Sequence, residues 1–311
     1  MQTRTSVGDT GATPVAIDFV VIGAAKAAST SLHHYLSAHP GTFVPRVKEI
    51  AFFSDTHLWD KGTDWYFDWF ENADGTRLTG EVSPQYMRDD ITAERMHQVL
   101  PHAKLIVSLR NPIDRLYSHY RHAVVEGNLQ NSVFGQLIDQ QLAGHDSSLV
   151  REFRELLRYG EYGRILTAYL RLYPREQIRV VQFDDLVKRP RATIDDLCAW
   201  LGLSGRVPDA ALDKRHNVGG ALRYPRLGRA VQEAAVWANR QPLLRAAAVQ
   251  LVSRQRLRSW WWWFRKEFNR KRVPTVKLTS RERTQVARYY ADDVRQLEEL
   301  LGEPMPWPEF H

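Results

Sequence analysis

A lysine and three hydroxyl side chains follow a short apolar run near the start of the chain. The run 18–23 ends in glycine and is followed by Ala24-Ala-Lys-Ala-Ala-Ser-Thr-Ser31, within which a helical pattern begins. Small side chains let backbone N–H groups approach an anion, and a helix N-terminus adds about half a positive charge to that of Lys26. These residues therefore predict a phosphate-binding turn, with Ser29 and Thr30 as hydroxyl donors. The alternative is a tight strand-to-helix turn that carries a surface lysine.

The spacing in this turn differs from that of a nucleotidase P-loop. A P-loop places its lysine directly before the Ser or Thr that holds magnesium, whereas Lys26 precedes Ser29 by three residues. The apolar run 104–110, which a metal-binding aspartate could have ended, ends in Arg110 instead. The pattern favours transfer of an anionic group without a metal ion over a magnesium-dependent kinase or nucleotidase.

Arg110 begins a second candidate motif, Arg110-Asn-Pro-Ile-Asp-Arg-Leu-Tyr-Ser118. It stands at the end of a predicted strand, which is where open α/β sheets place their ligands. Pro112 suits the first position of the following helix, and Ser118 lies about two turns into that helix. We expect Arg110 and Ser118 to hold one further phosphate. The alternative is an arginine that caps the sheet.

The motifs lie among predicted strands and helices that alternate along the chain. Apolar runs predict strands at 18–23, 78–83, 104–110 and 177–183, and helical patterns cover 31–39, 92–100, 112–126, 163–173 and 192–201. This alternation predicts an α/β fold with a mostly parallel sheet and helices on both faces. From residue 225 onward the pattern is helical or loop-like with no strong strand, and its last helix covers 280–301.

We expect a flexible N-terminus over residues 1–15 and a single domain over 16–311. Within it, residues 16–220 would form the α/β core, and 221–311 a helical C-terminal part that could cover the acceptor side. The one cysteine, Cys198, excludes an internal disulfide framework and a cysteine-based zinc site. The chain has neither an apolar run long enough for a membrane span nor the apolar segment of a signal peptide, so we expect a cytoplasmic protein.

The charge of the chain is concentrated in one segment. The whole chain has a formal net charge of +7, but residues 251–277 alone hold nine basic residues and one acidic residue. The remainder of the chain is therefore close to neutral. This distribution favours a local anionic partner over general attraction to nucleic acid.

Taken together, the two motifs resemble the sulfotransferases that use 3′-phosphoadenosine 5′-phosphosulfate (PAPS). The resemblance covers most of residues 17–220 and includes Val47-Lys-Glu-Ile-Ala-Phe-Phe53, Gly80-Glu-Val-Ser-Pro-Gln-Tyr86, Gly160-Glu-Tyr-Gly163, Phe183-Asp-Asp-Leu, Leu201-Gly-Leu203 and His216-Asn-Val-Gly219. It implies that the 5′-phosphosulfate is held by a loop made of Lys26, Ala27, Ala28, Ser29, Thr30 and Ser31. It also implies that Arg110 and Ser118 hold the 3′-phosphate. At positions 27 and 28, alanines replace the more usual Gly-Gly or Ser-Gly of that family.

Within that family the chain is most similar to the heparan sulfate N- and 3-O-sulfotransferases and their bacterial relatives. The deciding feature is Lys48-Glu49-x-x-Phe-Phe. The resemblance implies that Glu49 is the catalytic base, that Lys48 lies beside the reacting centre, and that Lys26 stabilises the leaving phosphate. The donor would leave as 3′-phosphoadenosine 5′-phosphate (PAP), with no metal ion. The alternative for Glu49 is a solvated loop carboxylate.

Other residues are candidates by position. Glu81, at a strand end, and His33, beside His34 in the first helix, are candidate substrate contacts. Glu81 could equally orient Lys26 or form a structural ion pair, and the histidines could be core or surface residues. Tyr162, like Tyr159, could contact the nucleotide or simply pack.

Two further sets come from the C-terminal third. The resemblance implies a loop over the 3′-phosphoadenosine side, at Lys214, Arg215 and Asn217. In the segment 254–272, Trp261 and Trp262 belong to a run of four tryptophans that no single helix face can bury. We expect this segment to cover the acceptor side, with the rings stacking on a sugar or lying at a lipid headgroup interface, or else packing against the core or a subunit partner.

The acceptor group would be a hydroxyl or an amine. The resemblance alone favours a carbohydrate as the acceptor; the alternatives are a glycosylated metabolite and a lipid-linked sugar. The rival functions are a P-loop-type kinase or nucleotidase, and a non-enzymatic basic protein that binds nucleic acid or a membrane. The kinase or nucleotidase would need magnesium and a Walker B aspartate, and the sequence indicates neither. The basic binding protein would leave Lys26, Glu49 and Arg110 unexplained. The sequence gives no indication of the oligomeric state.

Overall fold

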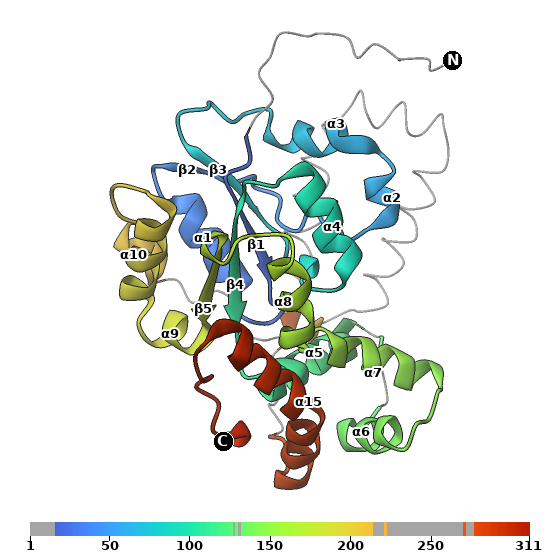
Figure 1. The fold of residues 1–311 in the computed structure, drawn as a ribbon. Helices are drawn as coiled ribbons and strands as arrows, with labels where there is room; N and C mark the ends of the chain where they lie inside the picture. The colour runs from blue at the N-terminus through green and yellow to red at the C-terminus, as the bar shows by residue number, and fades with distance from the viewer. Residues whose placement is uncertain (1–15, 127, 130–131, 214–220, 223–269, 272–276) are drawn as a thin grey trace, which may run out of the picture.

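The apolar runs of the sequence form the strands of one parallel sheet. In the computed structural model, which describes residues 16–126, 128–129, 132–213, 221–222, 270–271 and 277–311, the sheet has the order β2-β3-β1-β4-β5 (Figure 1). Its strands are β1 (Phe19–Gly23), β2 (Thr42–Phe43), β3 (Leu78–Val82), β4 (Lys104–Leu109) and β5 (Ile178–Gln182). The four predicted strands are confirmed. β2 was not predicted, because two residues are too short to show a periodic pattern.

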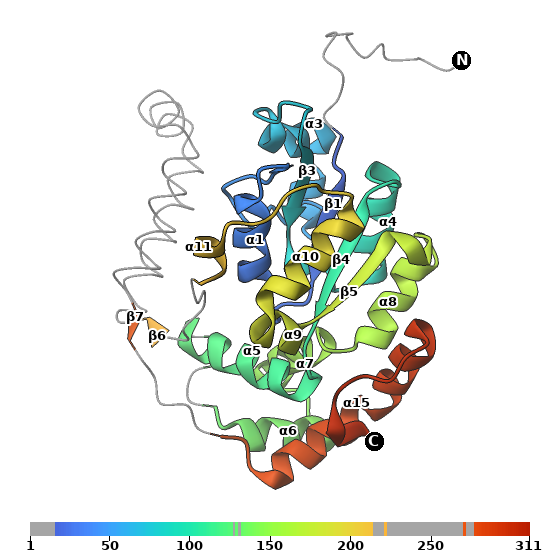
Figure 2. The same ribbon diagram turned by 90° about the vertical axis from the view of Figure 1, so that its left-hand side faces the viewer.

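Helices cover both faces of this sheet, because successive strand side chains point to opposite sides. Val20 and Ile22 belong to the apolar cluster that packs against α4 (Asp90–Val99) and α8 (Tyr162–Leu170). Phe19 and Val21 belong to the other cluster, which includes residues of α1 (Ser29–Ala38) and α10 (Pro190–Leu201). Figure 2 shows the sheet between these two layers. The predicted α/β fold with helices on both faces is therefore confirmed.

The remaining helices extend the layers and the carboxyl edge of the sheet. They are α2 (Thr56–Trp59), α3 (Gly62–Phe67), α5 (Pro112–Glu126), α6 (Phe134–Leu142), α7 (Ser148–Arg158), α9 (Phe183–Lys188), α11 (Asp209–Leu212) and α15 (Ser280–Leu301). In Figure 1 the arrowhead of β4 points toward α5 and α15, whereas α3 lies at the opposite end of the sheet. The motifs that follow β1 and β4 therefore lie at the same edge.

The last helix, α15, packs into the same apolar core as the sheet. Its residues Val286, Tyr290 and Val294 are buried in the cluster that also contains the β1 side chain of Val20. Gly163 of α8 allows the two helices to approach closely, because a Cβ atom there would lie 2.3 Å from the Asp293 carbonyl oxygen. α15 is thus built into the fold around the sheet.

Two short features concern the C-terminal third. Ala221–Leu222 (β6) and Arg270–Lys271 (β7) form an antiparallel pair, although the sequence showed no strong strand beyond residue 225. Each strand has only two residues, which is too short for an alternating sequence pattern to predict it. None of the helices in the described ranges is long and apolar enough to cross a lipid bilayer.

Candidate active site

The turn between β1 and α1 is shaped by its backbone and tied to β4. Lys26 and Ala28 have φ angles of 69° and 66°, the left-handed region that glycine adopts most readily. The N–H of Ala24 donates to the carbonyl of Ser108 at 2.8 Å, and the Ser108 hydroxyl donates to the carbonyl of Ala27. Ala27 is fully buried, so its methyl group packs inward. The alanines therefore support a tight turn here.

The start of α1 presents backbone N–H donors beside this turn. The first intrahelical bond runs from the N–H of Leu32 to the carbonyl of Ala28 at 3.1 Å. The N–H groups of Ser29, Thr30 and Ser31 belong to the first turn, where a helix has no internal acceptors to offer. This end of a helix favours an anion through its N–H groups and its dipole.

Lys26 lies in this turn with a perturbed amine. Burial lowers the pKa of Lys26 to about 8, while Glu126 and Glu49 act in the opposite direction and Lys48 and Arg115 lower it further. Within the described ranges, its ammonium group makes no hydrogen bond or ion pair. An anionic ligand at the turn would add negative charge beside this amine and favour its charged form.

Lys48 connects the turn to Glu49. Its Nζ atom donates to the hydroxyls of Ser29 at 3.2 Å and Thr30 at 3.3 Å, and to Oε1 of Glu49 at 2.7 Å. The Lys48 side chain is 11% exposed, and that of Glu49 is 43% exposed. The structure thus brings the two predicted groups, the donor loop and the carboxylate, into one hydrogen-bond network.

The backbone fixes Glu49 in an unusual conformation. Its φ angle is 66°, and its N–H donates to the carbonyl of Val82 at the end of β3, at 3.0 Å. Its second carboxylate oxygen, Oε2, accepts from Nε2 of Gln85 at 3.1 Å. Burial works to raise the pKa of Glu49, but Lys48, Lys26 and Gln85 outweigh it and hold the pKa below its ordinary value. The carboxylate is therefore ionised at neutral pH.

Arg110 is held against the same turn. Its Nη1 atom donates to the carbonyl of Lys26 at 3.2 Å, and its guanidinium carbon lies 4.5 Å from the centre of the Phe183 ring. The Tyr162 hydroxyl donates to the carbonyl of Arg110 at 3.0 Å. Ser118 lies half-buried on α5, and its shared role with Arg110 remains a prediction.

Three candidates are buried and tied to the protein itself. Tyr162 is fully buried, burial raises its pKa to about 12, and it positions Arg110 through the backbone. His33 is 9% exposed, and its Nε2 atom donates to the carbonyl of Pro45 at 3.1 Å. Glu81 is 1% exposed and accepts hydrogen bonds from hydroxyl groups, and its contact with an acceptor stays a prediction.

Five predicted residues lie outside the described ranges: Lys214, Arg215, Asn217, Trp261 and Trp262.

The sequence analysis missed several neighbours of the site. Gln85 donates a hydrogen bond to Glu49. It belongs to the segment 80–86 that resembles the sulfotransferases, but a glutamine there does not by itself predict this contact. Arg115, fully buried, stands inside the motif that begins at Arg110 and donates to Nδ1 of His119 at 3.1 Å. Burial, then Arg115 and Lys26, lower the pKa of His119 to about 2. His119 is therefore neutral beside two cations.

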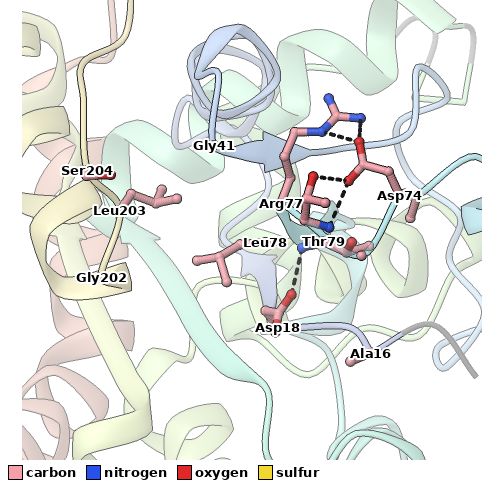
Figure 3. Close-up of a pocket in the computed structure, with 13 residues that line it drawn as sticks. Ala16, Asp18, Gly41, Asp74, Arg77, Leu78, Thr79, Gly202, Leu203 and Ser204 are labelled. Carbon is pink, nitrogen blue, oxygen red and sulfur yellow. Dashed lines mark hydrogen bonds and ion pairs between the residues drawn. The ribbon is translucent and has the colours of Figure 1, made fainter. Parts of the chain in front are cut away.

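A hollow in the described surface lies at the other edge of the sheet. Figure 3 shows that it is lined by Asp18, Asp74, Arg77 and their neighbours, at the starts of β1 and β3. Arg77 pairs with Asp74 at 2.7 Å, and Asp18 accepts from the N–H of Thr79 at 2.7 Å. These charged groups already have partners. The described residues contain no group of three or more side chains placed to hold a metal ion.

Comparisons with known proteins agree with this geometry. A sequence model described as "Sulfotransferase family" matches residues 55–209, which include Arg110 and Tyr162 and begin after Glu49. The chain thus matches the sulfotransferase family over about half of its length. The crystal structure of a sulfotransferase from Alicyclobacillus acidocaldarius has the same fold, with a TM-score of 0.61 and 23% identity over 94% of this chain and 98% of that one.

Curated members of the family resemble only part of the chain. Bifunctional heparan sulfate N-deacetylase/N-sulfotransferase 2 of Bos taurus is 32% identical over 197 residues, 60% of this chain and 22% of that protein. Heparan sulfate glucosamine 3-O-sulfotransferase 5 of Homo sapiens is 26% identical over 188 residues, 60% of this chain and 54% of that protein. The similarity thus spans about a fifth of the first relative and about half of the second.

Proposed function

We propose that this chain transfers the sulfuryl group of PAPS to a hydroxyl or amine of an acceptor. The observation that carries the proposal is the position of Lys48, whose Nζ atom binds Ser29, Thr30 and Glu49. A group bound at the turn and a proton donor bound at Glu49 would therefore lie next to each other. The family match supports sulfotransfer as the reaction.

The residues fit the donor as an anion. Lys26, Lys48 and Arg110 contribute positive charge around the turn, and the first turn of α1 contributes N–H donors. We assign the 5′-phosphosulfate to residues 26–31 and the 3′-phosphate to Arg110 and Ser118. No metal ligand is part of this assignment.

In the reaction, the acceptor oxygen or nitrogen attacks sulfur in line. The new bond to sulfur forms while the bond from sulfur to the bridging phosphate oxygen breaks, and that oxygen leaves with the electron pair as part of PAP. Glu49 accepts the acceptor proton, a contribution typically worth about 10² to 10⁴ in rate. Lys26 and the N–H groups of the turn stabilise the charge that develops on the leaving phosphate. Arg110 holds the donor in register.

For the acceptor we propose a carbohydrate. The support is the naming of two relatives as heparan sulfate sulfotransferases, one acting on nitrogen and one on oxygen. The acceptor panel described below decides between an amine and a hydroxyl. We also propose a cytoplasmic location.

The test combines donor binding and product detection. Calorimetry with PAP in the presence of EDTA should show binding, whereas a magnesium-dependent kinase or nucleotidase would prefer ATP with magnesium. Incubation with PAPS and a panel of sugars, phenols and lipids, beginning with heparan sulfate and its de-N-sulfated form, should yield a product heavier by one sulfuryl group by mass spectrometry. Absence of PAP binding would refute the proposal.

A further inference from the structure

Glu81 is a buried carboxyl group that the proposed reaction does not use. It is 1% exposed at the end of β3, and within the described ranges no cation pairs with it. Three hydroxyls bind it: Tyr66 at 2.9 Å and Tyr86 at 3.0 Å on Oε1, and Ser83 at 2.9 Å on Oε2. Burying a carboxyl group is costly unless its hydrogen bonds are satisfied. The three hydroxyls supply these hydrogen bonds, and two of them, Ser83 and Tyr86, lie next to the residues that contact the Glu49 segment.

The first connection from Glu81 reaches the backbone beyond Glu49. The Ser83 hydroxyl donates to Glu81 and accepts from the N–H of Ala51 at 3.4 Å. A hydroxyl has a single proton, so giving it to Glu81 directs the oxygen lone pairs of Ser83 toward other donors. The carboxyl group thus orients the oxygen that holds Ala51.

The second connection reaches the carboxylate of Glu49. Gln85, which donates to Oε2 of Glu49, stands directly before Tyr86, whose hydroxyl binds Glu81. The carbonyl of Tyr86 also accepts from Tyr169 at 2.7 Å, and Tyr86 is fully buried. The side chain of Gln85 therefore projects from a segment that Glu81 helps to anchor.

The segment that carries Glu49 needs such anchors. Glu49 and Ala51 have φ angles of 66° and 59°, a region that non-glycine residues occupy at a cost in free energy. Two hydrogen bonds to the end of β3 hold the segment: from Glu49 to the carbonyl of Val82, and from Ala51 to Ser83. Only the second depends on a side chain.

We propose that Glu81 is a positioning residue that holds Glu49 in place for proton transfer, through Ser83 on the backbone side and through Tyr86 and Gln85 on the carboxylate side. The inference rests on the proposed role of Glu49 as base. It assigns Glu81 no contact with donor or acceptor.

The test uses Ser83→Ala and Glu81→Gln, with Tyr66→Phe as the matched control. Tyr66→Phe removes a hydroxyl from Glu81 but touches neither connection to Glu49. For Ser83→Ala we expect kcat to fall about 10- to 100-fold, as small displacements of reacting groups do, with the Kd for PAP and the acceptor KM within about twofold of wild type. The assay measures transfer of the sulfuryl group from PAPS to de-N-sulfated heparan sulfate, or to another acceptor of the panel that the enzyme is found to sulfate.

Two further measurements separate positioning from general weakening. Hydrogen–deuterium exchange should accelerate at the amide of Ala51 in Ser83→Ala but not in the turn 24–31, and this readout requires no acceptor. In a Glu49→Gln background, Ser83→Ala should cause no further loss of kcat, because the residue through which it acts is gone. Glu81→Gln should lower kcat at least as much as Ser83→Ala does, again only when Glu49 is present. Should Glu81→Gln fail to fold, Ser83→Ala, which cuts the backbone connection from Glu81, still decides the question.

The outcomes distinguish the positioning role of Glu81 from the proposed role of Glu49 as the base. An inactive Glu49→Gln together with an unaffected Ser83→Ala would overturn the positioning role alone. Equal losses from Ser83→Ala in both backgrounds, or an equal loss from Tyr66→Phe, would also overturn it. Full activity of Glu49→Gln would refute the base assignment and remove the positioning role with it.

Discussion

The Nζ atom of Lys48 lies 2.7 Å from Oε1 of Glu49 and also binds two hydroxyls at the start of α1. One ammonium group therefore contacts both the turn before α1 and the carboxylate of Glu49. Bound donor would bring negative charge to the turn and compete with Glu49 for this lysine. Donor binding and release of the carboxylate from Lys48 would then be coupled by electrostatics.

Replacing the two partners should have different effects. Glu49→Gln keeps the size of the side chain and removes the base, so we expect kcat to fall at least about 100-fold while the Kd for PAP stays within about twofold.

Lys48→Met removes the largest influence that lowers the pKa of Glu49, and burial then raises that pKa. The acid limb of the pH–rate profile should move to higher pH. A limb that does not move would contradict the coupling.

Lys26 should make donor binding depend on pH. Burial lowers the pKa of the free amine to about 8, and an anionic donor favours the charged form. Binding of PAP should therefore take up protons near pH 8.5 and weaken as the pH rises above about 8. Calorimetry in buffers of different ionisation enthalpy measures the uptake, which Lys26→Met should abolish. Equal uptake in the variant would assign the titration to another group.

Arg110 should distinguish nucleotides by their 3′-phosphate. Arg110→Ala should weaken PAP binding by about 10- to 100-fold, the loss of a charge-assisted contact, and leave adenosine 5′-phosphosulfate almost unaffected. Tyr162→Phe, which loses only the hydrogen bond to the Arg110 carbonyl, should have a much smaller effect. If Arg110→Ala weakens both nucleotides equally, the arginine does not bind the 3′-phosphate.

Glu81 should make stability fall as the pH rises. Burial raises its pKa to about 7 from 4.5, so the folded protein holds this proton where the unfolded chain has released it. The contribution is present below about pH 4.5 and is lost as the pH rises through about 7. Between pH 5 and pH 8, the free energy of unfolding of the wild type should drop relative to that of Glu81→Gln, by up to about 3 kcal/mol. Parallel denaturation curves would show that Glu81 does not titrate in this range.

The sequence predicted the elements with strong local signals. β4 is built around the apolar residues Leu105–Val107, and α5 begins at Pro112, as its predicted first position requires. α15 covers 280–301 as expected, since Thr279 and Glu282 cap its start and Gly302 ends it. These signals lie within a few residues of the feature that they determine, so a single sequence contains them.

What the sequence could not supply are contacts between distant segments. Lys48 and Glu49 were singled out by resemblance, but their bonds to Ser29 and Gln85 depend on the order of strands in the sheet. Glu81 looked like a site carboxylate, because its spacing does not reveal that Tyr66 folds over it from α3. Residue type gives the chemistry, and only the fold gives the partner.

The carboxylate of Asp293 in α15 accepts the N–H groups of Gly163 and Arg164, and so fixes the beginning of α8. The adjacent Tyr162 holds the carbonyl of Arg110. Contacts over some 130 residues of chain form late, since the intervening chain must first be ordered. During synthesis on the ribosome, Arg110 would therefore lack its final support until α15 has emerged. A nascent chain would acquire its full grip on a nucleotide only after α15 has been synthesised.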